Sequence, residues 1–237
     1  EEKDLPFFIG LMKNLFDQKF PTPEPVINKN GNYISEINGK KAAVVSFLKG
    51  SAKKVLSPND CFEVGLYTGK LHIITKNLSG KRENKLSINS WENIYSKVKN
   101  DCAKIHPNLT KIIEKNLELI KNKWPKDLPS GIIHADLFPD NIFFKDNKLT
   151  GIIDFYFSCY DFYVFEIAIC LNALCFEGQK ENLSFNVTKA KKFIDGYSSI
   201  KKLTDEEKKS LKILCQGAAM RFLLTRVFDY LNLTEGA

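Results

Sequence analysis

The spacing of apolar residues predicts a helix near the start of the chain, followed by a β-hairpin. In residues 5–16 the apolar side chains recur three and four positions apart, as on one face of an α-helix, and Asp4 stands where an N-cap is expected. Two runs typical of strands follow within residues 32–48. The dipeptide Asn38-Gly39 lies between these runs and favours a two-residue hairpin turn.

The middle of the chain is predicted to be mostly helical. Ser57 is a favourable N-cap and is followed by a proline, so we expect a helix from this point to about Ile74. A polar, loop-like stretch comes next. Two further helices are predicted near residues 91–102 and 109–123, the second capped by Asn108.

Helical patterns return towards the end of the chain. The segment 165–176 is apolar on nearly all sides, which is typical of a buried helix. Thr204 and Glu207 have the spacing of a capping box, in which each side chain bonds the backbone N–H of the other residue. We expect them to open a long final helix that continues over residues 208–231.

A short β unit lies between these helical regions. Two β runs, Ile142–Phe144 and Leu149–Ile153, flank residues 145–148, where an Asp-Asn pair tolerates positive φ and favours a tight hairpin. We therefore expect an α+β fold in two parts. Residues 1–48 hold a helix and strands, and residues 49–237 are mostly helical and carry this hairpin.

Composition narrows the class of protein. A hydrophobic content of 43% is enough for a real core, and no apolar run approaches the ~20 residues of a membrane span. The net charge is +7, but the lysines are scattered and are not interleaved with aromatic residues. We expect no nucleic-acid binding and no membrane association. A solvated lysine-rich face and an anionic small ligand both fit this charge.

The cysteines indicate a reducing environment. There are six, none of them in a CxxC pair, and most lie in apolar segments. Residues 1–4 are Glu-Glu-Lys-Asp, which is not the start of a secretory signal. We therefore expect free thiols and a cytoplasmic protein.

The stretch "GIIHADLFPDNIFF" carries the clearest chemistry. Asp136 and Asn141 lie just before the first strand of the predicted hairpin, and Asp154 ends its second strand. Because a hairpin folds its two ends onto one another, we expect these side chains at one edge. Mg²⁺ takes one or two oxygen ligands from protein and the rest from phosphate and water. Asn141 and Asp154 can supply those oxygens, and Asp136 can accept the proton of an attacking hydroxyl, which suits phosphoryl transfer.

Other polar residues also allow plainer interpretations. We expect His134 to support the loop by bonding its backbone, and Asp140 to be a solvated turn residue. Asp161 can cap the buried helix. Glu166 places a carboxylate in an apolar helix, which is costly unless the carboxylate is hydrogen-bonded.

The motif H-x-D-x-x-x-x-N, formed by His134, Asp136 and Asn141, matches the catalytic loop of kinases, with Asp154 where kinases carry a metal-binding aspartate. Ala135 replaces the arginine usual in protein kinases, so the loop more closely resembles the aminoglycoside-phosphotransferase-like group of small-molecule kinases. Five segments together resemble the bacterial homoserine kinases of that fold: "LPFFIGLM", "GIIHADLFPDNIFF", "GIIDFYFSCYD", "AICLNALCFE" and "RFLLTR".

The resemblance implies a protein-kinase-like fold of two lobes, with a helical C-lobe and an incomplete N-lobe. It also implies ATP and Mg²⁺ as cofactors and L-homoserine as the acceptor, phosphorylated to O-phosphohomoserine on the route to threonine. Two other functions stay open. One is another small-molecule kinase acting on choline, an aminoglycoside or a sugar, and the other is a non-catalytic nucleotide-binding module.

The resemblance further suggests roles for residues outside the loop. Glu166 is expected to brace the catalytic loop, and Asp161 to lie near the metal and substrate. At the seam between the two parts, the resemblance implies an adenine slot formed by Ser46, Phe47 and Leu48.

The final helix carries two of the three arginines, Arg221 and Arg226. A buried arginine needs an anion, which can be an internal carboxylate or the α-carboxylate of the substrate. We expect one of the two to bind the substrate, with Arg221 the better candidate, and the other to pair internally.

The chain also departs from the family pattern. Homoserine kinases of this type carry strands, a phosphate-covering loop and an ATP-positioning lysine before the region that matches residue 1, and they continue past Ala237. We therefore expect a partial chain. Phe8 aligns with the glutamate that usually pairs that lysine, and the acidic residues that could replace it are Glu1, Glu2 and Asp4.

Overall fold

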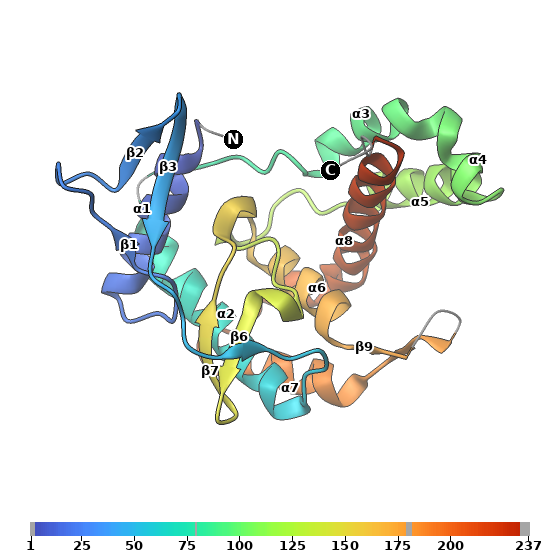
Figure 1. Ribbon diagram of the computed structural model, residues 1–237. Helices are drawn as coiled ribbons and strands as arrows, with labels where there is room; N and C mark the ends of the chain where they lie inside the picture. The colour runs from blue at the N-terminus through green and yellow to red at the C-terminus, as the bar shows by residue number, and fades with distance from the viewer. Residues whose placement is uncertain (1–2, 79, 179–181, 233–237) are drawn as a thin grey trace.

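The computed structural model describes residues 3–78, 80–178 and 182–232. Figure 1 shows a smaller part on one side, made of one helix and a sheet, beside a larger and mainly helical body. The α+β fold predicted from the sequence is confirmed. The smaller part consists of α1 (Leu5–Asp17) and the strands β1 (Pro25–Val26), β2 (Ile34–Ile37) and β3 (Lys40–Val45), with the antiparallel order β1-β3-β2.

The predicted hairpin forms at the predicted turn. Ile37 pairs with Lys40, and Asn38 and Gly39 between them have φ of 51° and 75°, the left-handed values that this turn requires. The second strand ends at Val45 rather than near residue 48. The N–H of the next residue, Ser46, still bonds the carbonyl oxygen of Glu24 and continues the pairing by one residue.

The start of α1 differs from the expectation in one respect. Asp4 does occupy the N-cap position, but its side chain makes no capping hydrogen bond. Instead the carboxylate forms ion pairs with Arg82 and Lys85, which lie in the segment that leads to the third helix. This partner is far away in sequence, so local spacing could not reveal it.

The larger part is built on seven helices among the described residues: α2 (Pro58–Ile74), α3 (Ile88–Val98), α4 (Cys102–Ile105), α5 (Leu109–Lys123), α6 (Tyr163–Leu174), α7 (Val187–Ser198) and α8 (Asp205–Leu231). The two capping predictions at Ser57 and Thr204 are confirmed, each as a reciprocal capping box. Asn108 is the N-cap residue of α5 as predicted, but its side chain makes no capping hydrogen bond. The helix α7 was not predicted.

Short strands and 3-10 turns connect these helices. The strands are β4 (Ser51–Ala52), β5 (Ser130–Ile133), β6 (Ile142–Lys145), β7 (Lys148–Ile152), β8 (Cys159–Phe162), β9 (Phe176–Glu177) and β10 (Ser184–Phe185). The turns are η1 (Thr75–Asn77), η2 (Lys99–Asp101), η3 (Pro139–Asn141) and η4 (Phe155–Phe157).

The central β unit contains the predicted hairpin. β6 and β7 pair antiparallel around Asp146 and Asn147, whose φ values are 50° and 58°, so this prediction is confirmed. β4 adds to the other edge of β6, and β5 pairs with β8. The chain crosses from one sheet to the other over residues 46–50. The predicted division after residue 48 lies in this crossing and stays a prediction.

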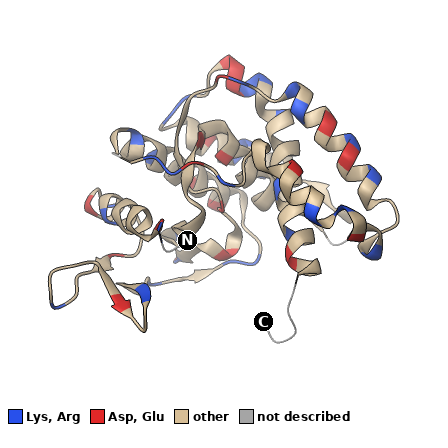
Figure 2. Cartoon of the chain, turned by 90° about the horizontal axis from the view of Figure 1, so that it is seen from above, with Lys and Arg blue, Asp and Glu red and all other residues tan. Residues whose placement is uncertain are grey.

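The core of the helical body depends on close helix contacts. In α2 and α7, Gly65 and Gly196 face the backbone of the opposite helix, and a Cβ on either glycine would lie about 2 Å from a carbonyl oxygen. The helix α6 is buried along most of its length, as predicted. Figure 2 shows basic residues interspersed with acidic ones along the outer helices. Within the described residues, no helix is both long enough and apolar enough to cross a membrane.

Candidate active site

The loop after β5 carries the predicted catalytic aspartate, and a buried carboxylate holds it. Glu166 of α6 is fully buried and accepts hydrogen bonds from the backbone N–H groups of His134 and Ala135, the latter at 3.1 Å. Ala135 has a left-handed backbone with φ of 66°, which is unfavourable for a residue with a side chain. Glu166 therefore fixes a strained backbone directly before Asp136. Burial raises the pKa of Glu166 to about 7, partly opposed by these two N–H donors.

His134 links the loop to the end of the hairpin. Its Nδ1 accepts a hydrogen bond from the backbone N–H of Asp136 at 3.2 Å, so the proton lies on Nε2, which donates to the carbonyl oxygen of Ile153 at 2.9 Å. The ring is buried, and burial lowers its pKa to about 4. Neutral His134 thus links the backbone of Asp136 to that of Ile153, the residue before Asp154.

Asn141 joins the same constellation. Its amide nitrogen donates to the backbone oxygen of Asp136 at 2.8 Å and to the Asp136 carboxylate at 3.3 Å. Its own backbone oxygen accepts from the N–H of Ile153 at 3.0 Å, beside Asp154. Among the described residues, the hydrogen bonds of the Asn141 side chain all start from nitrogen. The amide oxygen is therefore free to bind a cation.

The carboxylate of Asp154 acts electrostatically on Asp136. The pKa of Asp136 is raised to about 6, mainly by burial, and the nearby carboxylates of Asp154 and Asp140 add to the shift. Arg221 and the bond from Asn141 act in the opposite direction. Asp154 itself has a left-handed backbone, with φ of 63°, at the start of η4. The structure therefore gathers the residues that the hairpin was predicted to gather.

This donor set fits a magnesium ion. In the described parts of the chain, no cluster of three or more His, Cys, Asp or Glu side chains could hold a metal by itself. One carboxylate and one amide oxygen match the few protein ligands that Mg²⁺ uses when phosphate and water complete its shell. The effect of the Asp154 carboxylate on Asp136 also indicates a place where a cation would be favourable.

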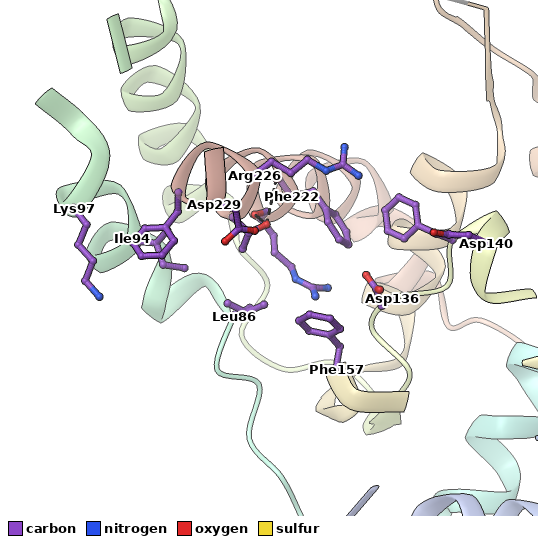
Figure 3. Close-up of a pocket in the computed structure, with 13 residues that line it drawn as sticks. Leu86, Ile94, Lys97, Asp136, Asp140, Phe157, Phe222, Arg226 and Asp229 are labelled. Atoms are coloured by element: carbon purple, nitrogen blue, oxygen red, sulfur yellow. Dashed lines mark hydrogen bonds between the residues drawn. The ribbon is translucent and has the colours of Figure 1, made fainter. Parts of the chain in front are cut away.

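A cavity of about 550 Å³ opens beside Asp136, between the catalytic loop and α8. Figure 3 shows Asp136 and Phe157 facing this helix, from which Arg226 and Asp229 project. Apolar side chains form much of the wall, and the charged side chains come from α8, the catalytic loop and α3. The other lining residues are Leu86, Ile94, Lys97, Phe138, Asp140, Arg221, Phe222, Thr225 and Phe228.

The two arginines of α8 differ sharply. Arg221 is only 2% exposed, its Nη1 donates to the carbonyl oxygen of Ala135 at 2.5 Å, and its Nε has no partner. Burial lowers its pKa, opposed by several nearby acids of which Asp136 is the strongest. Arg226 is exposed and lies 5.8 Å from the ring of Phe138 and 5.9 Å from that of Phe222. Neither arginine forms a salt bridge within the described chain, so the expected internal pairing of one of them is not observed.

A second cavity, of about 710 Å³, lies between α1, β3 and the segment that precedes α3. Leu86, Phe157 and Arg221 line both cavities, so the two spaces meet at these side chains. The aromatic side of the second cavity includes Phe8 and Tyr156, whose rings touch edge to face at 5.3 Å.

Asp161 lies apart from these cavities. One of its carboxylate oxygens accepts from the side-chain amide of Asn84 at 2.6 Å, and the other accepts from the N–H of Phe162 at 2.7 Å. Burial raises its pKa. Phe162 is the N-cap residue of α6, and no side chain caps that end of the helix. Asp161 therefore neither caps α6 nor lines either of the two cavities.

The predicted adenine slot is only partly available. The N–H of Ser46 donates to the carbonyl oxygen of Glu24 at 2.8 Å, so it is already used. Phe47 is 92% exposed, and Leu48 packs against Gly151 of β7. The binding of adenine at this crossing stays a prediction. This prediction rests on the backbone groups of Phe47 and Leu48 and on the apolar side chain of Leu48.

Sequence reasoning missed several residues near the site. Phe157, Leu86 and Phe222 line the first cavity, and Arg82 contacts both α1 and the backbone after η4. The segment with residues 82 and 86 looked like a polar loop, and only its single arginine was a distinctive signal. Of the acidic residues proposed to pair the ATP-positioning lysine, Asp4 is already in ion pairs, and residues 1 and 2 lie outside the described residues.

The chain matches known kinases in sequence and in structure. The model of the phosphotransferase enzyme family matches residues 1–199. The homoserine kinase of Beijerinckia indica is 43% identical over 237 residues, which are 100% of this chain and 73% of that protein. The homoserine kinase of Xanthobacter autotrophicus is 44% identical over 234 residues, or 99% of this chain and 72% of the relative.

Solved structures show the same fold at low sequence identity. An amicoumacin kinase in complex with AMP-PNP, Ca²⁺ and Ami superposes with a TM-score of 0.75 at 17% identity, over 99% of this chain and 74% of that one. A spectinomycin phosphotransferase in complex with ADP and spectinomycin superposes with a TM-score of 0.71 at 13% identity. The match covers 98% of this chain and 74% of that one. Given a family model that covers most of the chain and relatives above 40% identity along nearly all of it, the chain belongs to the phosphotransferase enzyme family and, within it, to the homoserine kinases.

Proposed function

We propose that this chain transfers the γ-phosphoryl group of ATP to the side-chain hydroxyl of L-homoserine, giving O-phosphohomoserine for threonine biosynthesis. One observation carries the proposal. Asp136, Asn141 and Asp154 are joined through the loop and hairpin, and a buried cation, Arg221, lies beside them in the wall of a cavity. This arrangement supplies an acceptor for a proton, two oxygen ligands for a metal and a partner for an anion.

In this proposal Asp136 accepts the proton of the homoserine hydroxyl and orients the oxygen for attack. With a pKa of about 6, the carboxylate is mostly ionised at neutral pH and is more basic than an ordinary aspartate. Asn141 keeps the carboxylate in place through its amide nitrogen, which leaves its amide oxygen to hold a metal ion that would bind there. When bound by Asn141 and Asp154, Mg²⁺ neutralises part of the phosphate charge.

Arg221 is the proposed partner of the homoserine α-carboxylate. A buried guanidinium without an ion pair is costly, and Arg221 has only a carbonyl oxygen as hydrogen-bond partner, with Nε unsatisfied. A carboxylate that enters the cavity would complete its coordination. Choline has no carboxylate and aminoglycosides are polycations, so this feature favours homoserine over the rival acceptors.

Cytoplasmic location is part of the same proposal. The six cysteines are free thiols, and five of them are buried, as expected for a protein of a reducing compartment. ATP is the proposed phosphoryl donor, with adenine at the crossing near Phe47 and Leu48.

The decisive experiment measures phosphate transfer from ATP by the full-length protein over a panel of hydroxyl compounds. The panel contains L-homoserine, choline, an aminoglycoside, a hexose, and homoserine amide as the matched compound without a carboxylate. We expect efficient transfer to homoserine alone. Transfer to choline or homoserine amide at a similar kcat/KM would contradict the acceptor assignment. Nucleotide binding without transfer to any member would favour a non-catalytic module.

A further inference from the structure

Arg82 connects three parts of the molecule that are distant in sequence. Its Nε donates to the Asp4 carboxylate at the start of α1, at 2.9 Å, and its Nη1 donates to the carbonyl oxygen of Ser158 at 3.1 Å. Its own carbonyl oxygen accepts from the N–H of Tyr160 in β8 at 2.7 Å. The side chain is only 14% exposed. One planar group thus holds the start of α1 against the chain that follows η4.

The connecting segment, defined as residues 80–87, brings Arg82 to this position. In Figure 1 it is the green-blue coil that runs from beside the N-terminus to α3. The guanidinium carbon of Arg82 also lies 5.0 Å from the ring of Phe8 in α1. Phe8 in turn touches Tyr156 of η4, so an apolar contact and a polar contact join the same two elements.

The element held by Arg82 begins with the proposed metal ligand. Asp154 is the N-cap residue of η4 and Ser158 is its C-cap residue. On the near side, Ile153 is fixed by His134 and by Asn141 through backbone hydrogen bonds. On the far side, Arg82 fixes the carbonyl oxygen of Ser158. The left-handed backbone of Asp154 is unfavourable for most residues with a side chain, and the two restraints help to maintain it.

We propose that Arg82 is a positioning residue for the metal site: by holding η4 against α1, it keeps the Asp154 carboxylate where the metal binds. The inference rests on the proposed function, because it takes Asp154 as a metal ligand. Arg82 lines the second cavity but not the cavity that contains Asp136. Its effect therefore passes through η4 and is not a direct contact with the reacting groups.

Lys85 supplies a matched control. Its ammonium group bonds the same Asp4 oxygen as Arg82, at 2.7 Å, but it makes no bond to η4, and its side chain is 63% exposed. Replacing Lys85 removes one positive charge and one ion pair with Asp4. Replacing Arg82 removes the same charge and, in addition, the restraint on Ser158 and the contact with the ring of Phe8. A difference between the two variants therefore reports how Arg82 holds η4 and α1 together, and not its charge near Asp4.

The experiment measures the nucleotide dissociation constant with and without Mg²⁺, in the full-length protein and in the variants Arg82→Met, Lys85→Met and Asp154→Ala. We expect Arg82→Met to weaken binding roughly three- to tenfold in the presence of Mg²⁺, as for the loss of one or two hydrogen bonds, and less than about twofold in its absence. Lys85→Met should bind as the unchanged protein does under both conditions. Asp154→Ala should lose most of the Mg²⁺ effect.

Three outcomes would overturn the inference. Arg82→Met could keep the full Mg²⁺ effect while Asp154→Ala loses it, which would refute the role of Arg82 and leave the proposed function intact. Lys85→Met could match Arg82→Met, which would assign the effect to the charge near Asp4. Asp154→Ala could keep the Mg²⁺ effect, which would refute the metal site and the inference together. If Arg82→Met does not fold, Arg82→Lys is judged by the same comparison, since one ammonium group cannot replace the planar fork.

Discussion

Arg221 and Ala135 are 86 positions apart in sequence, yet Nη1 of the arginine donates to the carbonyl oxygen of the alanine at 2.5 Å. This bond places a buried positive charge directly behind the loop that carries Asp136. The charge lowers the pKa of that aspartate against the larger effect of burial. A single side chain of α8 therefore supports the loop backbone, sets the basicity of Asp136 and faces the cavity.

Replacement of Asp136 by asparagine should nearly abolish turnover. Asparagine keeps the shape of the side chain but cannot accept the proton of the acceptor hydroxyl. We expect kcat to fall by well over tenfold, which corresponds to more than about 1.4 kcal/mol, with ATP affinity close to normal. Steady-state kinetics and a nucleotide titration measure the two quantities. A variant with more than a tenth of the normal kcat would exclude Asp136 as the proton acceptor.

The same aspartate should determine the acidic limb of the pH profile. Its pKa is raised to about 6, so below this pH the carboxyl is protonated and cannot accept another proton. We expect kcat/KM for ATP, which reports the free enzyme, to fall about tenfold per pH unit below pH 6. The acidic limb of the kcat profile should lie at lower pH than that of kcat/KM, because a cation near Asp154 would favour the ionised form of Asp136. A flat profile down to pH 5 would contradict the assignment.

The two arginines of α8 should separate in their effects on the substrate. Arg221→Met should raise the KM for homoserine by one to two orders of magnitude, as for the loss of roughly 1.5–3 kcal/mol of charged hydrogen bonding. The KM for ATP should change little. Arg226 is exposed and stacks on aromatic rings, so Arg226→Met serves as the control and should change the homoserine KM less than about threefold. Equal effects of the two changes would remove Arg221 from its proposed role.

The features that could be predicted well from the sequence are formed by residues that lie close together along the chain. The turns at Asn38-Gly39 and at residues 146–147, and the helix caps at Ser57 and Thr204, depend on residues within four positions of one another. Local chemistry decides such features, so they can be read from one chain. The catalytic loop was also predictable, because a hairpin brings its own ends together.

What the sequence did not predict depends on distant partners. Asp4 looked like an N-cap, but ion pairs with Arg82 and Lys85 draw its side chain away from the helix. The bond between Asp161 and Asn84 was likewise not predicted, and a role of Asp161 near the metal and substrate stays a prediction. No periodicity or spacing reports a contact across some eighty positions, because such contacts are decided by tertiary packing.

The contact between α2 and α7 allows a stability prediction that is independent of the site. A Cβ on Gly65 would lie 2.0 Å from the carbonyl oxygen of Phe193, and backbone cannot move aside as a flexible side chain can. Gly65→Ala should therefore lower the free energy of unfolding by about 1–3 kcal/mol or more. Gly10 in α1 has nothing within 4 Å of such a Cβ, so Gly10→Ala should raise stability by about 0.5–1 kcal/mol. Urea unfolding of both variants tests the pair, and equal effects would contradict the observed packing.

The last prediction concerns Glu166 and pH. Burial raises its pKa from 4.5 to about 7, so the folded state holds the proton that the unfolded state releases near pH 4.5. The stabilising contribution of this proton is complete below pH 4.5, and it is lost as the pH rises towards 7. The loss amounts to about 3 kcal/mol, at the level of 1.36 kcal/mol per pKa unit. The neutral amide in Glu166→Gln cannot lose a proton, so it should avoid this loss.

We therefore expect the stability of Glu166→Gln relative to the unchanged protein to increase between pH 5 and pH 8. Urea unfolding at several pH values measures this difference. The titrations of His134 and Asp136 occur in both proteins, so they largely cancel when the two curves are subtracted. Glu118→Gln, an exposed change on α5, is the control for replacing a carboxylate by an amide away from the site. If the Glu166→Gln difference is flat, the two backbone N–H donors to Glu166 outweigh its burial, and the carboxylate is ionised throughout this range.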